Sequence, residues 1–268
     1  MDNNVNKIAS FGLKKSLKGI NPIKIALPPI ANKIAPAMYP SKVADARMRM
    51  FNLDGSEGKM CGNGIRCVAK FLRYHGLVEK DTMTIETLSG ILTCELLYHY
   101  GEIINVRVNM GKAVLEPKEI PVNISGSKIV DYPAKIGGDN YNITCVSTGN
   151  PHCVVFTKIV DTIDIEKIGP KFEFNELFPE RVNTEFIQVI NNKTLKMRVW
   201  ERGSGETQAC GTGACAAVVA AVENGICPRN EDVTVKLKGG DLNIKYTDDG
   251  TVYLTGNAEI VFKGTVII

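Results

Sequence analysis

The sequence has no apolar run approaching the roughly 20 residues that a membrane-spanning helix requires. Its first residues also lack the continuous apolar core of a secretory signal peptide. Blocks of like charge are missing and the net charge is only +3, so the electrostatics favour neither nucleic-acid binding nor membrane binding. We therefore expect a cytoplasmic protein whose partner is a small molecule.

Histidine is scarce, with three among 268 residues, and no cysteine pair has the CxxC spacing. Five residues separate Cys61 from Cys67, and four separate Cys210 from Cys215, so no metal site is expected. The eight cysteines are an even number, but the chain is far longer than the small secreted scaffolds that disulfides hold together.

The most informative feature is an internal repeat with an offset of 149 residues. A period of this length indicates two similar domains, which fits a chain of 268 residues with 44% hydrophobic residues. The matched positions are Met48, Arg49, Glu57, Cys61, Gly62, Gly64 and Gly76 with Met197, Arg198, Glu206, Cys210, Gly211, Gly213 and Gly225.

Each repeat predicts a strand, a turn, a CGxG segment and a helix. Alternation predicts strands over 47–51 and 194–201, and helices follow over 65–74 and 214–223, each ending at a glycine. The second helix is apolar on every side, which predicts that it is buried. The expected fold class is α/β (α+β), with two pseudo-symmetric domains, each an antiparallel sheet wrapped around a central helix. We place the first domain at 1–105, completed by 257–268, and the second at 106–256.

Both repeated cysteines directly precede a glycine-rich helix start. Unpaired backbone N–H groups and the helix dipole stabilise a thiolate there, so we expect a lowered cysteine pKa. If both helix starts face one cleft, Cys61 and Cys210 can act as base and acid on opposite faces of a carbon centre without a cofactor. We interpret the remaining cysteines as structural: Cys67, Cys94, Cys145, Cys153, Cys215 and Cys227.

Four segments resemble the diaminopimelate epimerase family: FNLDGSEGKMCGNGIRC (51–67), STGNPHCV (147–154), VNTEF (182–186) and ERGSGETQACGTGA (201–214). The resemblance runs from about Tyr39 to the C-terminus. It implies interconversion of L,L- and meso-diaminopimelate, for lysine and peptidoglycan synthesis, by a homodimer that uses neither pyridoxal phosphate nor metal. It also implies that each domain is a β-barrel-like sheet around its helix.

The same resemblance assigns residues. Cys61 and Cys210 match the catalytic pair, the first being the base toward the L,L isomer. The positions that match substrate-binding residues are Asn52, Asn150 and Asn183, the pair Glu201 and Arg202, and the amide cradles Gly62–Asn63 and Gly211–Thr212. His152 has a supporting role outside the catalytic set. Taken singly, Asn150 could be a turn residue, Asn183 a cap, and Glu201 with Arg202 a surface pair.

Residues 1–38 depart from the family pattern, and the repeat counterpart of Asn150 falls on residue 1, where nothing similar is found. The first domain is thus expected to be shortened or replaced at this edge, and a weakened or inactive member is one alternative. A racemase of proline, hydroxyproline or histidine is another. A thiol switch that uses Cys61 and Cys210 is a third.

Overall fold

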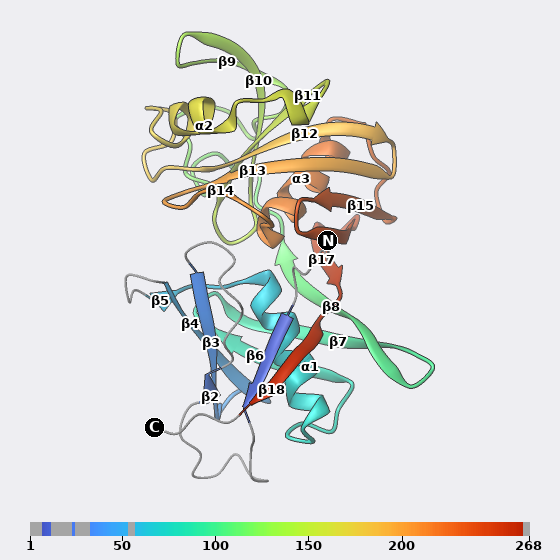
Figure 1. Cartoon of the computed structure of the whole chain (residues 1–268). Coiled ribbons are helices and arrows are strands. Elements are labelled where there is room, and N and C mark those ends of the chain that lie inside the picture. The colour runs from blue at the N-terminus through green and yellow to red at the C-terminus, as the bar shows by residue number, and fades with distance from the viewer. Residues whose placement is uncertain (1–6, 12–22, 25–32, 53–56, 265–268) are drawn as a thin grey trace. The chain divides into compact units, whose positions relative to one another are not determined.

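The computed structural model describes residues 7–11, 23–24, 33–52 and 57–264, with side chains over 38–51 and 57–260. The chain divides into two compact units (Figure 1). The first unit comprises Asp2–Asn109 and Thr255–Ile268, and the second comprises Met110–Leu254. Over the described ranges, no helix is both long enough and apolar enough to cross a bilayer.

The described part of the first unit contains one long helix, a mixed sheet and a separate two-stranded sheet. The strands follow the order β2-β3-β4-β6-β7-β8, β5 pairs with β4, and β1 pairs with β18 in parallel. Helix α1 lies against β1, β3, β6 and β7. The elements are β1 Lys7–Phe11, β2 Ile23–Lys24, β3 Lys33–Tyr39, β4 Ala46–Asn52, β5 Glu57–Gly58, α1 Gly62–Tyr74, β6 Thr82–Thr87, β7 Gly90–His99, β8 Glu102–Lys112 and β18 Glu259–Gly264.

The second unit has strand order β17-β16-β15-β13-β12-β11-β10-β9, with β14 on β13. The buried helix predicted from the sequence is confirmed as α3, because residues Ala214 to Ala221 are fully buried in the core. The elements are β9 Tyr132–Ile136, β10 Asp139–Ser147, β11 Pro151–Thr157, η1 Val160–Thr162, α2 Ile165–Glu173, β12 Asn183–Asn191, β13 Thr194–Glu201, β14 Gly205–Thr207, α3 Gly211–Glu223, β15 Asp232–Leu237, β16 Gly240–Tyr246 and β17 Thr251–Gly256.

The α+β class is confirmed, and the sheets, expected to be antiparallel, also contain parallel pairings. Strands β4 and β6 pair in parallel, as do β13 and β15, and β11 and β12. All three pairings have a direct cause: a helix, α1, α3 or α2 respectively, lies between the paired strands in sequence. A helical crossover returns the chain to the starting edge of the sheet, so the next strand runs in the same direction.

Backbone register extends the repeat upstream of Met48. Met38 lies opposite Met48 as Ile187 lies opposite Met197, and each pair keeps the offset of 149. Strand β3 is therefore the counterpart of β12. The sequence alone had left residues 33–38 outside the repeat.

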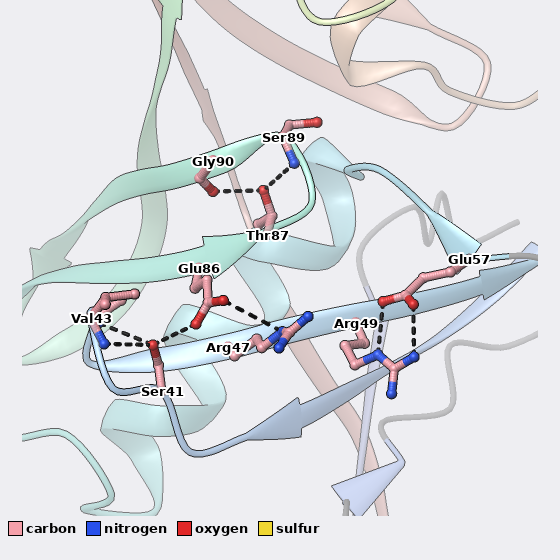
Figure 2. A network of polar contacts seen from close by, with 10 residues as sticks. Ser41, Val43, Arg47, Arg49, Glu57, Glu86, Thr87, Ser89 and Gly90 are labelled. Atoms are coloured by element: carbon pink, nitrogen blue, oxygen red, sulfur yellow. Dashed lines mark hydrogen bonds and ion pairs between the residues drawn. The ribbon is translucent and has the colours of Figure 1, made fainter.

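Each unit carries the same ion pair just before its cysteine. Arg49 Nε and Nη2 donate to the two carboxylate oxygens of Glu57 at 2.8 and 2.7 Å, joining β4 to β5 (Figure 2). Arg198 and Glu206 join β13 to β14 in the same way, at 2.7 and 3.1 Å. The matched Arg and Glu of the repeat thus fasten the hairpin that leads to each CGxG segment.

Candidate functional site

Cys61 and Cys210 are the N-cap residues of α1 and α3. Both have extended backbone, with φ/ψ of −142°/115° and −123°/112°. Each sulfur accepts a hydrogen bond from the amide three residues on, Gly64 or Gly213, at 3.4 Å. The helices begin three residues earlier than the sequence predicted, because the cysteine itself caps the first turn in place of the usual serine or aspartate.

The first amides of each helix form an anion cradle. In each helix the cap sulfur accepts from the third amide of the first turn. The first two amides, those of Gly62 and Asn63 or of Gly211 and Thr212, have no preceding turn whose carbonyl could accept from them. Such amide pairs, at the positive end of a helix dipole, suit a carboxylate. These are the four residues for which the sequence predicted this arrangement.

The second residue of the cradle differs between the two helices, Asn63 in α1 and Thr212 in α3. Asn63 Oδ1 accepts from Arg66 at 3.2 Å, and the same buried guanidinium donates to Gly62 O at 2.9 Å and to Asn257 O at 3.4 Å. The repeat counterpart of Arg66 is Cys215. Thr212 Oγ1 instead lies 3.4 Å from the Cys210 sulfur.

Burial raises the pKa of the Cys210 thiol well above its ordinary value, and the charges of Glu201 and Glu185 raise it further. Hydrogen bonds from Thr212 and Gly213 act in the opposite direction and are outweighed. The expected lowering of the pKa at this helix start is therefore wrong for Cys210. A helix terminus is worth at most about 2 kcal/mol, less than the cost of charging a sulfur in a closed site with two carboxylates nearby.

His152 links two of the site residues. Its Nδ1 lies 2.7 Å from Glu185 Oε1, and its Nε2 lies 2.9 Å from Asn150 Oδ1. His152 and Glu185 are both fully buried, on the neighbouring parallel strands β11 and β12. Asn150 just precedes β11 and is half-buried.

The Asn183 side chain ties together two segments of the second unit. Its Nδ2 donates to Pro151 O at 2.9 Å, and its Oδ1 accepts from Arg202 N at 3.0 Å. One amide hydrogen of Asn183 remains beyond these two bonds.

Glu201 and Arg202, at the end of β13, are both half-buried. Glu201 accepts from Thr207 Oγ1 of β14, and the Arg202 guanidinium donates to Glu180 O at 2.7 Å. Buried Glu173 supports the following turn, since it accepts from Gly203 N at 3.0 Å and from Trp200 Nε1 at 2.8 Å.

The predicted residues thus fall into two sets. Asn150, Asn183, Glu201, Arg202, Cys210, Gly211 and Thr212 are joined, directly or through a shared neighbour, within the second unit. Cys61, Gly62 and Asn63 lie together in the first unit. Asn52 ends β4, opposite Lys33, and its side chain lies outside the described residues.

Sequence reasoning missed Glu185, Glu173 and Arg66. A signal existed for Glu185, because a charged residue stands in the otherwise buried half of strand β12, within the VNTEF segment. No comparable signal marks Glu173, which α2 brings to the turn after β13 from a distant part of the sequence.

Comparison with known proteins places these features in one family. The diaminopimelate epimerase family model matches residues 29–116 and 144–261, and so begins upstream of Tyr39. The diaminopimelate epimerase of Acetivibrio thermocellus is 52% identical over 230 residues, covering 85% of this chain and 81% of the relative. That of Methanococcus maripaludis is 49% identical over 232 residues, covering 86% and 83%.

Solved structures share the fold at low identity. A probable proline racemase from Agrobacterium radiobacter superposes with a TM-score of 0.63 at 15% identity, over 84% of this chain and 73% of that one. A predicted epimerase from Pseudomonas aeruginosa gives 0.62 at 16% identity, over 86% and 83%. These likenesses show the architecture, whereas the sequence matches show the family: the chain belongs to the diaminopimelate epimerases.

Proposed function

We propose that this protein interconverts L,L- and meso-diaminopimelate, with Cys61 and Cys210 as its acid–base pair. The relatives at about half identity carry the assignment of substrate. The supporting geometry is the pair of N-capping cysteines, each beside two helix-start amides. These amides bind the α-carboxylate and stabilise the negative charge that develops as the Cα proton leaves.

The state of Cys210 suggests the direction of proton flow. With a raised pKa, Cys210 is a thiol at neutral pH and can donate a proton. Register places Pro36 and Asn52 at the counterparts of Glu185 and Glu201, so the two carboxylates near Cys210 are replaced by uncharged residues in the first unit. We assign Cys61 as the base toward the L,L isomer and Cys210 as the acid.

The proton balance of one turnover is closed. The Cys61 thiolate takes the α-proton of the substrate, and the Cys210 thiol delivers its own proton to the opposite face of the same carbon. The enzyme is left with a Cys61 thiol and a Cys210 thiolate. That form is competent for the reverse reaction. The starting form is restored when Cys61 releases one proton to solvent and Cys210 takes one up.

Incubation with L,L-diaminopimelate in D2O tests the assignment. We expect deuterium at Cα of the meso product, and we expect Cys61→Ala and Cys210→Ala each to abolish epimerisation. Full turnover by either variant would exclude the paired mechanism. Activity on proline, hydroxyproline or histidine but not on diaminopimelate would favour the rival racemases, and a lack of exchange on any of them would favour an inactive member or a thiol switch.

Family membership also supports a homodimer. Sedimentation equilibrium of the full chain should give twice the mass of 29.2 kDa. A monomer at the concentrations used for catalysis would contradict this part of the proposal.

A further inference from the structure

The arrangement of His152 determines where one of its protons lies. Both ring nitrogens face oxygens: Nδ1 faces Glu185 Oε1 and Nε2 faces Asn150 Oδ1. With the amide oxygen of Asn150 toward the ring, the 2.9 Å contact is a hydrogen bond only if Nε2 carries a proton, because an amide oxygen can only accept. A neutral imidazole with its only proton on Nδ1 does not fit, because Nε2 and Oδ1 would then present lone pairs to each other.

The surroundings of Glu185 are consistent with a proton on Nε2 of His152. With Nε2 protonated, the 2.7 Å contact to Glu185 is made either by an imidazolium with a carboxylate or by a neutral imidazole with a protonated carboxyl group. Burial raises the pKa of Glu185, which makes a shared proton favourable. In both forms the pair has no net charge, as expected for two fully buried groups.

The position of Glu185 is fixed by close packing. A Cβ added at Gly213 in the first turn of α3 would lie 2.6 Å from Glu185 Oε1. The other carboxylate oxygen of Glu185 is buried and has no hydrogen-bond partner among the described residues. The carboxyl group of Glu185 is thus packed between α3 and His152, and its Oε1 lies at hydrogen-bond distance from the imidazole.

We propose that Glu185 is a positioning residue that keeps a proton on Nε2 of His152. This proton holds the Asn150 amide with its oxygen toward the imidazole, so that Asn150 offers its N–H groups to the substrate. No described residue accepts from Asn150 Nδ2, which leaves both of its hydrogens for a ligand. A donor selects a carboxylate oxygen and rejects an ammonium group. The inference rests on the proposed function, because it takes diaminopimelate as the ligand.

Nitrogen NMR of the histidines tests the proton assignment without any activity measurement. The chain has only three histidines, so comparison with His152→Gln identifies the His152 signals. We expect a protonated Nε2 at neutral pH in the ligand-free protein. A neutral ring protonated only at Nδ1 would overturn the inference, whatever the enzyme's activity.

Substitutions at Glu185 separate positioning from packing. In Glu185→Gln the side-chain amide can donate to Nδ1, which keeps the proton on Nε2, so KM should stay within about threefold of the parent. Glu185→Leu removes the partner of Nδ1, and KM should rise about tenfold or more, the usual worth of one hydrogen bond to a charged group. Equal KM values in the two variants would contradict the proposal.

Thr184→Val is the matched control for this strand. Thr184 is fully buried beside Glu185, and its hydroxyl has no partner among the described residues. Neighbouring side chains on a strand face opposite sides, so this change should leave KM and the His152 signals unchanged. If Thr184→Val raised KM as Glu185→Leu does, general disturbance of β12 would be the cause, and the inference would fail.

Asn150→Asp tests the polarity that Asn150 presents. The aspartate has the same shape but no hydrogen to donate, and it places negative charge near the substrate. We expect KM for diaminopimelate to rise by about 10- to 100-fold. An unchanged or lower KM would mean that Asn150 accepts from an ammonium group and would overturn the inference, while leaving wild-type epimerisation intact.

Discussion

At the scale of single residues, the surroundings of Cys210 determine whether its sulfur is a thiol or a thiolate. The two N-caps have the same geometry and the same 3.4 Å amide contact. Burial and the charges of Glu201 and Glu185 act on the sulfur of Cys210 and raise its pKa. A base and an acid that work together need different resting protonation states, and buried charge is an effective way to set them apart.

The first prediction concerns the ionisation of Cys210. Its raised pKa means that the thiolate appears only as the pH rises above neutrality, so alkylation by iodoacetamide should be slow at pH 7 and accelerate toward alkaline pH. Removal of one carboxylate in Glu201→Gln should move the midpoint of this profile to lower pH. Mass spectrometry of the Cys210 peptide measures it, and an unshifted midpoint would contradict the electrostatic explanation.

The second prediction uses the repeat as its own control. Gly213→Ala would force a Cβ to within 2.6 Å of Glu185, whereas the nearest atom to a Cβ at Gly64 is Cys61 Cβ at 3.5 Å, an ordinary contact. We expect Gly213→Ala to lower the free energy of unfolding by about 1–3 kcal/mol, as overpacking does. Gly64→Ala should change it by clearly less. Chemical denaturation compares them, and equal losses would argue against the close contact.

At the scale of elements, strand, hairpin, cap and helix form one unit that is used twice. The helices end alike as well: Gly76 and Gly225 have φ of +62° and +69°, and Leu77 N and Ile226 N reach back to Leu72 O and Ala221 O. These left-handed glycines follow the cap residue and close each helix with a Schellman motif. Both ends of each helix are therefore fixed by residues that the repeat preserves.

The third prediction concerns the two Arg–Glu pairs. Arg198 also donates to the carbonyls of Val160 and Ile163, and its side chain is 13% exposed, against 34% for Arg49. Arg198→Met leaves more buried acceptors without a hydrogen-bond donor than Arg49→Met does, so it should lower Tm by on the order of 5 °C. Arg49→Met should lower it less, because solvent screens the exposed pair. Calorimetry measures both, and the reverse order would refute this ranking.

At the scale of the whole molecule, the chain provides two helix starts with cysteine caps and amide cradles. In the proposed reaction the carboxylate is held by amides and the protons are carried by sulfur. All eight cysteines are free thiols, so none of them is locked in a disulfide. Chemistry of this kind depends on the oxidation state of the thiols.

The fourth prediction follows from that chemistry. Epimerisation should survive dialysis against EDTA and treatment with hydroxylamine, which removes pyridoxal phosphate, because the cysteines alone carry the protons. Thiol alkylation should abolish it. Loss of activity on chelation, restored by a divalent cation, would show that a metal takes part and would require another mechanism.

The sequence by itself determined the parts that local chemistry specifies. The 149-residue repeat, the glycine-rich segments before both helices and the apolar α3 can all be read from spacing and pattern, because they depend on neighbours along the chain. The candidate site residues were predicted from the four segments that resemble the family. Only the tertiary structure decided the parallel pairings, the match of β3 to β12, the raised pKa of Cys210 and the contact of Glu185 with His152. Each of these depends on which distant residues burial brings together, and a linear pattern of residues carries no such distance.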